Sequence, residues 1–471
     1  RGDGSMTVDV AVIGGGISGL ATAHDLKQRG HRVVVLERQT KPGGNAVSER
    51  RSGFLMEHGP STMNALVPAA NQISQTLGID DFRCDLGDGI QKRYLVAKGG
   101  LAGIPVRATG FLTANYLSPL AKLRVLAEFL VPHSGDCGEN DDDETVMDFC
   151  VRRFGREFAE RVMDPMVAGI YGGGRAAELS MGAIFPMLLA LEKKYGSVTL
   201  GIMHPAREGG KMPGSRLFSW RDGIATLADA FTRDLGADIS TGVTVRRLSR
   251  TAGGFEIQLG AAGRLRTRSV VIATQAHVAT KLLAGLDPDG AAAAEQIQAP
   301  PMAVVFLGYH RSKVEHPLDG LGFLTAEDEG RQILGSQFCS TMFPGRAPRD
   351  HVAVSAYIGG VRAPDLGRLP APDLIELARA EFRDLIGAKG EPAVAMVRHW
   401  PVGLPQYNVG HRQRINVLQQ SHQRHAGLYL TGNYLAGPSV AVCVGVAQKT
   451  AQSVHAYLAK GVESHFRQSA I

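Results

Sequence analysis

Three glycines near the start of the chain have the spacing that binds a nucleotide pyrophosphate. Gly14, Gly16 and Gly19 directly follow the apolar run 10–13 and precede a helical pattern over 20–29. The first glycine permits a tight turn, the second lets the backbone approach a phosphate, and the third lets the helix pack closely on the strand. The helix N-terminus adds N–H groups and a partial positive charge. The spacing therefore predicts a dinucleotide cradle.

A carboxylate stands where such a cradle needs one for the ribose. The apolar run Val33–Leu36 predicts a second strand, and it ends in Glu37, 21 residues after Gly16. A carboxylate at this distance hydrogen-bonds the ribose hydroxyls, and it would repel the 2′-phosphate of NADP. The following glycine pair, Gly43–Gly44, resembles the pair found after the ribose acid in the flavin amine oxidase and phytoene desaturase superfamily. FAD is therefore the dinucleotide expected.

The elements that must position this cradle are spread along the chain. An apolar, β-branched run at 270–273 predicts a further buried parallel strand. Residues 428–430 predict another strand, which leads into Gly432 and Asn433. A helix to Leu458 follows, and its N-terminus can face an anionic flavin carbonyl. Further helices are expected over 69–77 and 145–194, and antiparallel strands over 303–309 and 353–358.

The composition excludes several classes of function. The net charge is +6 and aromatic residues make up 6%. No dense Lys/Arg tract is interleaved with aromatic residues, so nucleic acid is not an expected partner. The five cysteines form no Cys-x-x-Cys pair or His/Cys cluster, which predicts no metal site and favours a reducing compartment. Residues 1–5 are interpreted as an expression remnant ahead of Met6, and with no recognisable signal peptide the expected location is cytoplasmic.

Residues 112–131 mix apolar and basic positions at helical spacing. A helix of this kind can lie on a membrane surface, or it can pack on its own domain. Both interpretations stay open. The first predicts a protein that is peripheral to the inner face of a membrane, because no stretch approaches the ~20 apolar residues that span a bilayer.

Sequence blocks over nearly the whole chain resemble the oxygen-dependent protoporphyrinogen oxidase family. The middle and late blocks are much more specific than the dinucleotide motif, which many unrelated oxidoreductases share. The blocks are Lys92–Tyr94, Asp164–Gly173, Leu179–Met181, Phe185–Pro186, Leu191–Ser197, Phe218–Gly223, Met342–Pro348, Trp400–His411 and Gly432–Asn433.

The resemblance implies a fold. The expected fold class is α/β with α+β: a Rossmann-like FAD-binding domain, a mixed-sheet substrate domain and an inserted helical domain. The approximate ranges are 6–90, 205–295 and 410–471 for the FAD-binding domain, 91–204 for the helical, membrane-associating domain, and 296–409 for the substrate-binding domain.

The resemblance also implies a reaction. Protoporphyrinogen IX would lose six electrons to FAD in three steps, with O₂ as acceptor and H₂O₂ as by-product, in haem biosynthesis. Coproporphyrinogen III is an alternative substrate, and another amine oxidase or desaturase reaction is an alternative activity. A flavin or tetrapyrrole carrier without turnover is the alternative from another class. A homodimer and hand-off of the product to a chelatase are further expectations.

Substrate contacts follow from the same resemblance. Arg93 corresponds to the arginine that pairs with a substrate propionate, which an arginine can hold by two parallel hydrogen bonds. Arg107 is a second candidate for this role. The backbone at Gly169 is expected over the flavin side of the macrocycle. Three residues correspond to the apolar side chains that sandwich the macrocycle, and two of them are polar replacements: Leu324, Gln337 and Tyr357.

The expected FAD contacts extend the glycine cradle and Glu37. They are Ser18, Arg38, Gly43, Gly44, Gly59, Thr244 (in the run Val243-Thr244-Val245), Trp400, Gly432, Asn433, Ser439 and Val440. Ala436-Gly437 departs from the more usual glycine pair before Ser439. No side chain is assigned as catalytic, because the flavin carries the difficult chemistry. His277, His351 and His411 are considered as proton acceptors and interpreted as structural.

Overall fold

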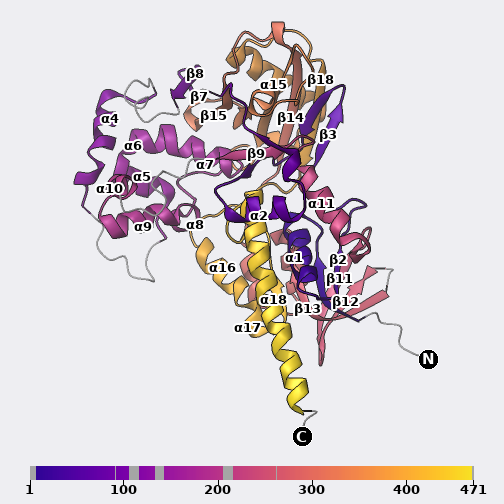
Figure 1. Ribbon diagram of the computed structural model, residues 1–471. Helices are drawn as coiled ribbons and strands as arrows, with labels where there is room; N and C mark the ends of the chain where they lie inside the picture. The colour runs from indigo at the N-terminus through magenta and orange to yellow at the C-terminus, as the bar shows by residue number, and fades with distance from the viewer. Residues whose placement is uncertain are drawn as a thin grey trace.

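The computed structural model describes residues 7–90, 92–105, 116–132, 143–204, 216–260 and 263–468, without the side chains of 7, 105 and 461–468. These residues form two seven-stranded sheets, two smaller sheets and a helical unit beside them (Figure 1). The long C-terminal helix runs along the first sheet and ends at the far end of the molecule from the second sheet.

The first sheet contains the predicted cradle strand at its centre. Its central parallel segments, Val10–Ile13, Val33–Leu36 and Val270–Ile272, are buried along their whole length and rich in valine and isoleucine, as parallel strands covered by helices are. The order is β10-β2-β1-β13-β12-β11, with β19 beside β13. The strands are β1 Thr7–Ile13, β2 Val33–Leu36, β10 Ile239–Ser240, β11 Val245–Thr251, β12 Gly254–Leu259, β13 Gly263–Ile272 and β19 Leu428–Leu430.

Helices cover both faces of this sheet, and each face has its own apolar core. One core is formed with α1 Ile17–Gln28, α2 Pro68–Thr76, α11 Ala225–Leu235 and α18 Val440–Gln468. The other is formed with α12 Ala276–Leu283, α13 Pro288–Glu295 and α16 His411–Gln419, and α17 Ser421–Arg424 follows α16. This arrangement confirms the Rossmann-like prediction. Helix α18 continues ten residues beyond the predicted end at Leu458.

The second sheet is mixed, as predicted, because β15 and β7 pair in parallel while its other pairs are antiparallel. Helix α15 Ala371–Ile386 packs on one face. The strands, in order across the sheet, are β18 Val394–Trp400, β14 Met302–His310, β17 His351–Gly359, β16 Gly335–Gln337, β15 Gly320–Thr325, β7 Lys92–Ala97 and β8 Gly100–Pro105.

One predicted boundary is wrong. The range 91–204 was expected to be helical, but residues 92–105 form a hairpin at the edge of the second sheet. Tyr94 and Val96 alternate with their neighbours and enter the core beneath α15. A segment in which apolar residues alternate with others can pair with an open sheet edge and bury its apolar side. The edge of β15 is available here, and β7 pairs with it. The other domain boundaries stay predictions.

The smaller elements complete the frame. A hairpin of β3 Ser48–Arg51 and β4 Phe54–Glu57 lies against the second sheet through Phe54 and Met56. A three-stranded sheet joins β5 Met63–Asn64, β9 Leu217–Trp220 and β6 Arg83–Asp85. A short helix, α14 Cys339–Met342, follows β16.

The helical unit packs around an apolar core of its own. Its helices are α4 Pro119–Leu126, α5 Val146–Phe154, α6 Arg156–Phe158, α7 Asp164–Ile170, α8 Met181–Ile184, α9 Pro186–Tyr195 and α10 Val198–Met203, with a 3₁₀ turn at Glu128–Leu130 and a π-helical turn at Ala159–Met163. Four of these helices begin at a hydroxyl that accepts a backbone N–H three residues on, as helix caps do: Ser118, Thr145, Ser180 and Ser197.

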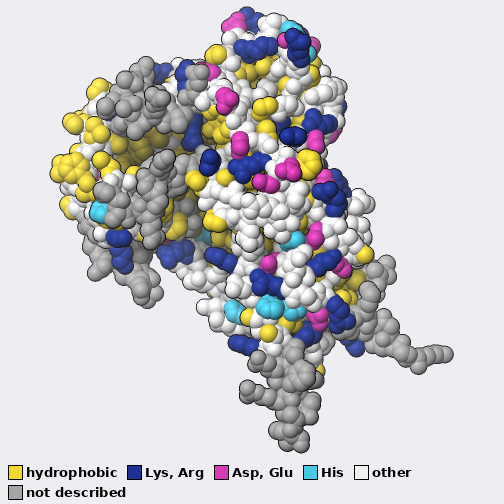
Figure 2. Space-filling view, in the orientation of Figure 1, with side chains coloured by type: hydrophobic (Ala, Val, Ile, Leu, Met, Phe, Trp, Pro, Cys, Tyr) yellow, Lys and Arg dark blue, Asp and Glu magenta, His cyan; other side chains and the backbone are white. Residues whose placement is uncertain are grey.

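Apolar side chains gather on the outer face of this unit, at the left of the view in Figure 2. They come from α4, the 3₁₀ turn and α10, and include Leu120, Leu123, Leu126, Phe129, Leu130, Leu200 and Met203, all exposed. We call these seven residues the apolar patch. None of the described helices has the length and apolar character needed to cross a membrane.

Candidate active site

The turn between β1 and α1 is built from the three predicted glycines. Gly14 has a left-handed φ of 107°, and a Cβ there would lie 2.8 Å from the carbonyl oxygen of Ala273. A Cβ on Gly19 would lie 1.9 Å from the carbonyl oxygen of Gly14. A Cβ on Gly16 would have Gly44 as its nearest neighbour, 4.0 Å away, which leaves room for a phosphate against the backbone. The turn therefore has the shape that a pyrophosphate requires.

Glu37 and the second glycine pair close over this turn. The Glu37 carboxylate accepts hydrogen bonds from the backbone N–H groups of Gly15, at 2.7 Å, and Gln39, at 2.6 Å. The N–H of Gly43 donates to the carbonyl of Gly15 at 2.7 Å. A Cβ on Gly44 would lie 3.0 Å from the Gly16 Cα. Glycines so far apart in sequence thus form one surface, with the carboxylate at its edge.

Two more predicted FAD contacts lie beside Glu37. Thr244 is half-buried, and the N–H of its neighbour Val243 donates to the Glu37 carbonyl at 2.9 Å. Arg38 is exposed at the end of β2. Ser18 is buried in the first turn of α1, directly behind the cradle.

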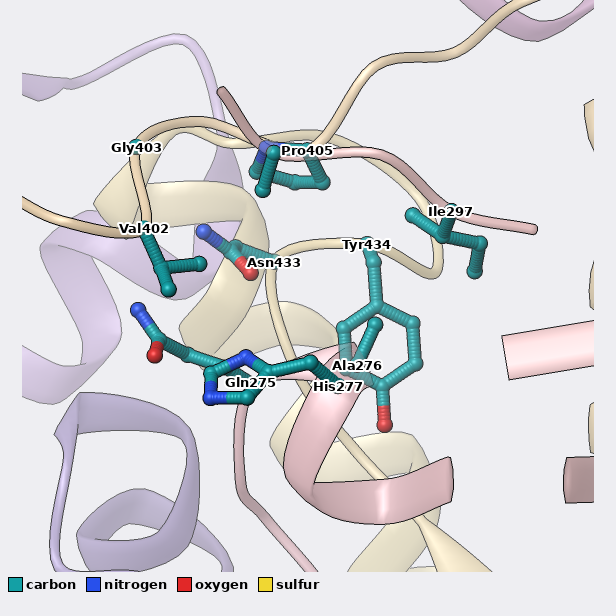
Figure 3. A pocket seen from close by; sticks show the side chains of 10 residues that line it. Gln275, Ala276, His277, Ile297, Val402, Gly403, Pro405, Asn433 and Tyr434 are labelled. Carbon is teal, nitrogen blue, oxygen red and sulfur yellow. The ribbon is translucent and has the colours of Figure 1, made fainter. Parts of the chain in front are cut away.

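The predicted residues at the C-terminal end of the chain lie at the same sheet edge. Gly432 and Asn433 follow β19, which pairs with β13 and therefore ends near the cradle. Ser439 and Val440 begin α18, and the Ser439 hydroxyl accepts the Val442 N–H at 3.5 Å. Figure 3 shows Asn433 with Gln275 and His277 around a pocket of about 120 Å³ at this edge.

A loop connects the cradle to the second sheet. A Cβ on Gly59 would lie 3.3 Å from the carbonyl oxygen of Asn45 and 3.5 Å from the Trp400 ring. The Trp400 indole donates to the carbonyl of His58 at 2.8 Å. Further along the loop, the Ser61 hydroxyl donates to the side-chain oxygen of Gln337 at 2.9 Å. The predicted FAD contacts Gly59 and Trp400 are therefore neighbours, and the loop leads directly to a predicted substrate contact.

The register of the second sheet brings the predicted substrate contacts onto one face. Leu324 pairs with Gly335, and Gly335 pairs with Tyr357. Gln337 is two residues from Gly335, so its side chain points to the same side. This is the face opposite α15, because the alternate residues Phe323 and Ala356 lie in the core beneath that helix.

Arg93 joins this face from the edge of the sheet. Leu95 pairs with Leu324 in the parallel register of β7 and β15. Arg93 precedes Leu95 by two residues and therefore lies on the same side of the sheet, where it is exposed. Residues 93 and 357 are thus placed on a common surface only by strand pairing.

Gly169 on α7 meets this face directly. A Cβ at Gly169 would lie 2.3 Å from the Leu324 Cδ2 atom, so only glycine allows α7 to approach the sheet so closely. Arg107, the second predicted carboxylate anchor, lies outside the described residues. The structure therefore brings together Arg93, Gly169, Leu324, Gln337 and Tyr357.

Sequence reasoning missed a buried ion pair beside Gln337. Glu57 and Arg346 are both buried, and their nearest charged atoms are 2.8 Å apart. Glu57 also accepts the N–H of Ile224 at 3.0 Å and the Ser48 hydroxyl at 2.5 Å. Burial raises the pKa of the Glu57 carboxyl, although Arg346 opposes this shift. Because Glu57 and Arg346 are separated by 289 residues, no local pattern could have revealed the pair.

His411, one of the histidines considered as a proton acceptor, is buried and stacks on Tyr407 with 4.0 Å between ring centroids. Its Nε2 atom lies 2.8 Å from the Tyr434 carbonyl oxygen, which fits a neutral ring that donates there. Burial lowers the pKa of His411 from 6.5 to about 4. Between pH 6.5 and about 4, the unfolded chain therefore binds a proton at His411 more readily than the folded protein does.

Stability is consequently expected to fall as the pH drops from 6.5 towards 4. The folded state resists protonation of His411 in this window, which costs roughly 3 kcal/mol once the pH is below both pKa values. A His411→Gln variant keeps an N–H donor but has no proton to bind, so its melting temperature should fall less over this range. Both proteins retain every other titrating group, so equal pH profiles for the two would contradict the prediction.

No cluster of three or more side chains suited to hold a metal ion occurs among the residues that the structure describes. The cradle fits the ADP part of FAD. Added Cβ atoms at Gly14 and Gly19 would strike backbone atoms, and the Glu37 carboxylate lies at the edge of the cradle.

The fold and the cradle define a class of protein. The sequence pattern of flavin-containing amine oxidoreductases matches residues 17–455. The chain belongs to this family, and it is an FAD-dependent oxidoreductase.

Individual proteins similar to this chain are named for more specific reactions. The chain is 30% identical to the chloroplastic protoporphyrinogen oxidase of Oryza sativa subsp. japonica, over 97% of this chain and 89% of that protein. It is 29% identical to the coproporphyrinogen III oxidase of Propionibacterium freudenreichii, over 94% and 90%. A crystal structure from Exiguobacterium sp. 255-15, provisionally assigned as a protoporphyrinogen oxidase, has a TM-score of 0.81 at 22% identity and covers 96% of this chain and 99% of that chain.

Proposed function

We propose that this protein oxidises protoporphyrinogen IX to protoporphyrin IX, with O₂ as acceptor and H₂O₂ as by-product. The observation that carries the proposal is the common face of Arg93, Leu324, Gln337 and Tyr357, with Gly169 against it. The loop through Gly59 and Ser61 connects this face to the glycine cradle. Relatives that are named for this reaction support the same substrate class.

Each part of the face has a task in this proposal. Arg93 holds a propionate at the edge of the sheet, where a guanidinium can make two parallel hydrogen bonds. Leu324 and Tyr357 cover the macrocycle, and Gly169 lets α7 approach it. Bound FAD supplies the electron acceptor for the three two-electron steps. The protein holds the substrate beside it and excludes competing reactions.

Anaerobic flavin reduction tests the proposal. The holoenzyme is mixed in parallel with protoporphyrinogen, a primary amine and a polyene, and bleaching of the flavin absorbance is followed. We expect rapid bleaching by the porphyrinogen alone. Fluorescent porphyrin and three H₂O₂ per macrocycle should then appear in air, because six electrons reduce three O₂ molecules. Bleaching by the amine or polyene only would refute the proposal, and porphyrin binding without bleaching would indicate a carrier.

Coproporphyrinogen III is the second candidate substrate. It carries four propionates, and the polar side chains of Gln337 and Tyr357 on the substrate face favour a substrate with more polar groups. A relative from Propionibacterium freudenreichii is named for this substrate. The ratio of kcat/KM for the two porphyrinogens, measured with one enzyme preparation, decides between them.

Replacing Arg93 by alanine is expected to weaken use of either porphyrinogen without loss of FAD. A charge-assisted hydrogen bond contributes about 1.5–3 kcal/mol, so kcat/KM should fall by roughly 10- to 150-fold. Lys98→Ala, in the turn of the same hairpin, is the matched control and should keep the wild-type value. An unchanged KM for a propionate-bearing substrate in Arg93→Ala would count against this role.

We also propose that the apolar patch contacts a membrane surface. Leu120 is 77% exposed, Leu130 70% and Met203 73%, and contiguous exposure of such side chains marks interaction surfaces. The patch lies on α4, the 3₁₀ turn and α10, which pack together. This arrangement fits an interfacial helix better than a helix packed wholly on its own domain.

A Leu120→Asp/Leu123→Asp variant should therefore bind vesicles of phosphatidylcholine and phosphatidylglycerol at least about tenfold more weakly, because each buried leucine contributes about 1.5 kcal/mol or more. Leu66→Asp, an exposed leucine near the first sheet, is the control. If the wild-type protein does not bind vesicles but has twice the monomer mass, the apolar patch would instead be the interface of a homodimer. Hand-off to a chelatase stays a prediction.

A further inference from the structure

Arg362 joins the helical unit to the second sheet at one buried point. It lies in the turn after β17, and its side chain is 8% exposed. Its guanidinium donates to the carboxylate of Asp164, the first residue of α7, and to the carbonyl oxygen of Thr325, at 3.3 Å. Thr325 is the last residue of β15 and follows Leu324. One side chain therefore holds the start of α7 and the end of β15.

Asp164 is itself held in place. It is buried, and its other oxygen accepts the N–H of Ala176 at 3.0 Å. This bond closes the segment from α7 to Ala176 into a loop. A buried carboxylate of this kind needs a cation beside it, because an isolated charge is costly away from water. Arg362 is the cation that the structure provides.

Beside Arg362, the backbone of residues 360 and 361 lies directly against the backbone of Gly172, with no room for a side chain between them. The N–H of Val361 donates to the carbonyl of Gly172 at 3.1 Å. A Cβ on Gly360 would lie 1.9 Å from that same carbonyl oxygen. The turn after β17 and the glycine turn after α7 thus form one tight junction. A shift of either turn would be transmitted to the other, because packed backbone does not compress.

The junction fixes the place where α7 meets the substrate face. Gly169 contacts Leu324, and these are two of the residues proposed to bind the macrocycle. Asp164 and Gly169 lie on the same helix, and Thr325 and Leu324 lie on the same strand. The two hydrogen bonds of Arg362 therefore set the position of Gly169 relative to Leu324.

We propose that Arg362 is a positioning residue for macrocycle binding, acting through Asp164 and the Thr325 carbonyl. This inference rests on the proposed function. A lysine at this position could pair with Asp164, but a single ammonium on a flexible stem cannot replace the guanidinium fork that also bonds Thr325. Arg362→Lys therefore separates the positioning role from the neutralisation of a buried charge.

The test compares wild type, Arg362→Lys, Asp164→Asn and the double variant. We expect each single variant to raise the KM for protoporphyrinogen roughly tenfold, with kcat changed less than about threefold. FAD content and melting temperature should stay near the wild-type values in Arg362→Lys. The KM of the double variant should be no higher than that of the more impaired single variant, because both changes remove the same contact. Arg368→Lys, an exposed arginine paired with Asp365, is the matched control.

Three outcomes would overturn the inference. They are a wild-type KM in Arg362→Lys, effects of the two single variants that multiply in the double variant, and loss of FAD or thermal stability with an unchanged KM in the active fraction. The last would mark a merely structural pair. A wild-type enzyme that oxidises no porphyrinogen would instead refute the proposed function, and this inference with it.

Discussion

A Gly19→Val variant is expected to purify with less bound FAD than the wild type. A Cβ at this position would lie 1.9 Å from the carbonyl oxygen of Gly14, which is a rigid backbone atom of the cradle. Overpacking costs about 1–3 kcal/mol, and relief here requires α1 to move away from β1 and from the phosphates. FAD affinity should therefore fall by roughly 5- to 150-fold. The ratio of flavin absorbance to protein absorbance, before and after titration with FAD, measures the effect.

The matched control is Gly285→Val, which adds the same side chain to the same sheet unit. A Cβ on Gly285 would have no neighbour within 4 Å, and its φ is not left-handed. This variant should keep its flavin. A Gly19→Val protein with full flavin content and wild-type affinity would show that the cradle relaxes freely, and the assignment of the pyrophosphate site would then be wrong.

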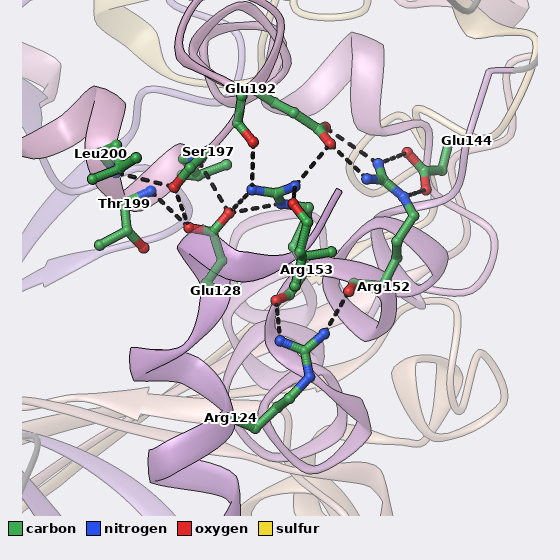
Figure 4. A network of polar contacts seen from close by, with 12 residues as sticks. Arg124, Glu128, Glu144, Arg152, Arg153, Glu192, Ser197, Thr199 and Leu200 are labelled. Carbon is green, nitrogen blue, oxygen red and sulfur yellow. Dashed lines mark hydrogen bonds and ion pairs between the residues drawn. The ribbon is translucent and has the colours of Figure 1, made fainter. Parts of the chain in front are cut away.

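A Glu128→Gln variant should lose the order of the helical unit. Glu128, in the 3₁₀ turn, and Arg153, on α5, are fully buried and form an ion pair (Figure 4). Glu128 also accepts the Ser197 hydroxyl at 2.6 Å and the N–H groups of Val198 and Thr199 at 3.1 Å each. Removing its charge leaves Arg153 paired mainly with Glu192, 3.3 Å away. Breaking a buried pair in this way costs about 3–5 kcal/mol.

Hydrogen exchange measures this loss locally, because a chain of several units does not unfold in one step. We expect the amides of α5 and α10 to exchange faster in Glu128→Gln, while those of β1 and β13 keep wild-type rates. Glu160→Gln removes one partner of an exposed pair with Arg156 in the same unit and should change exchange little. Equal exchange in the two variants would show that water reaches the Glu128 pair.

The sequence by itself determined the local parts of this protein. The strand at Val10–Ile13, the glycine turn and Glu37 could be predicted because each depends on residues close together in the chain. A left-handed φ at Gly14 and a buried β-branched run leave few local alternatives. The antiparallel strands 303–309 and 353–358 were predicted for the same reason. The helical character of residues 145–194 also followed from the local pattern, although the ends of the separate helices did not.

Tertiary structure decided which of these parts meet. Residues 92–105 belong to the second sheet because β7 pairs with the edge of β15. This pairing places Arg93 on the same face as Leu324 and Tyr357. The ion pairs Glu57–Arg346 and Asp164–Arg362 join residues 289 and 198 positions apart. Strand register and burial fix such contacts, and both depend on the whole chain. The sequence could therefore identify the nucleotide cradle by itself, whereas the substrate face exists only once the second sheet has paired.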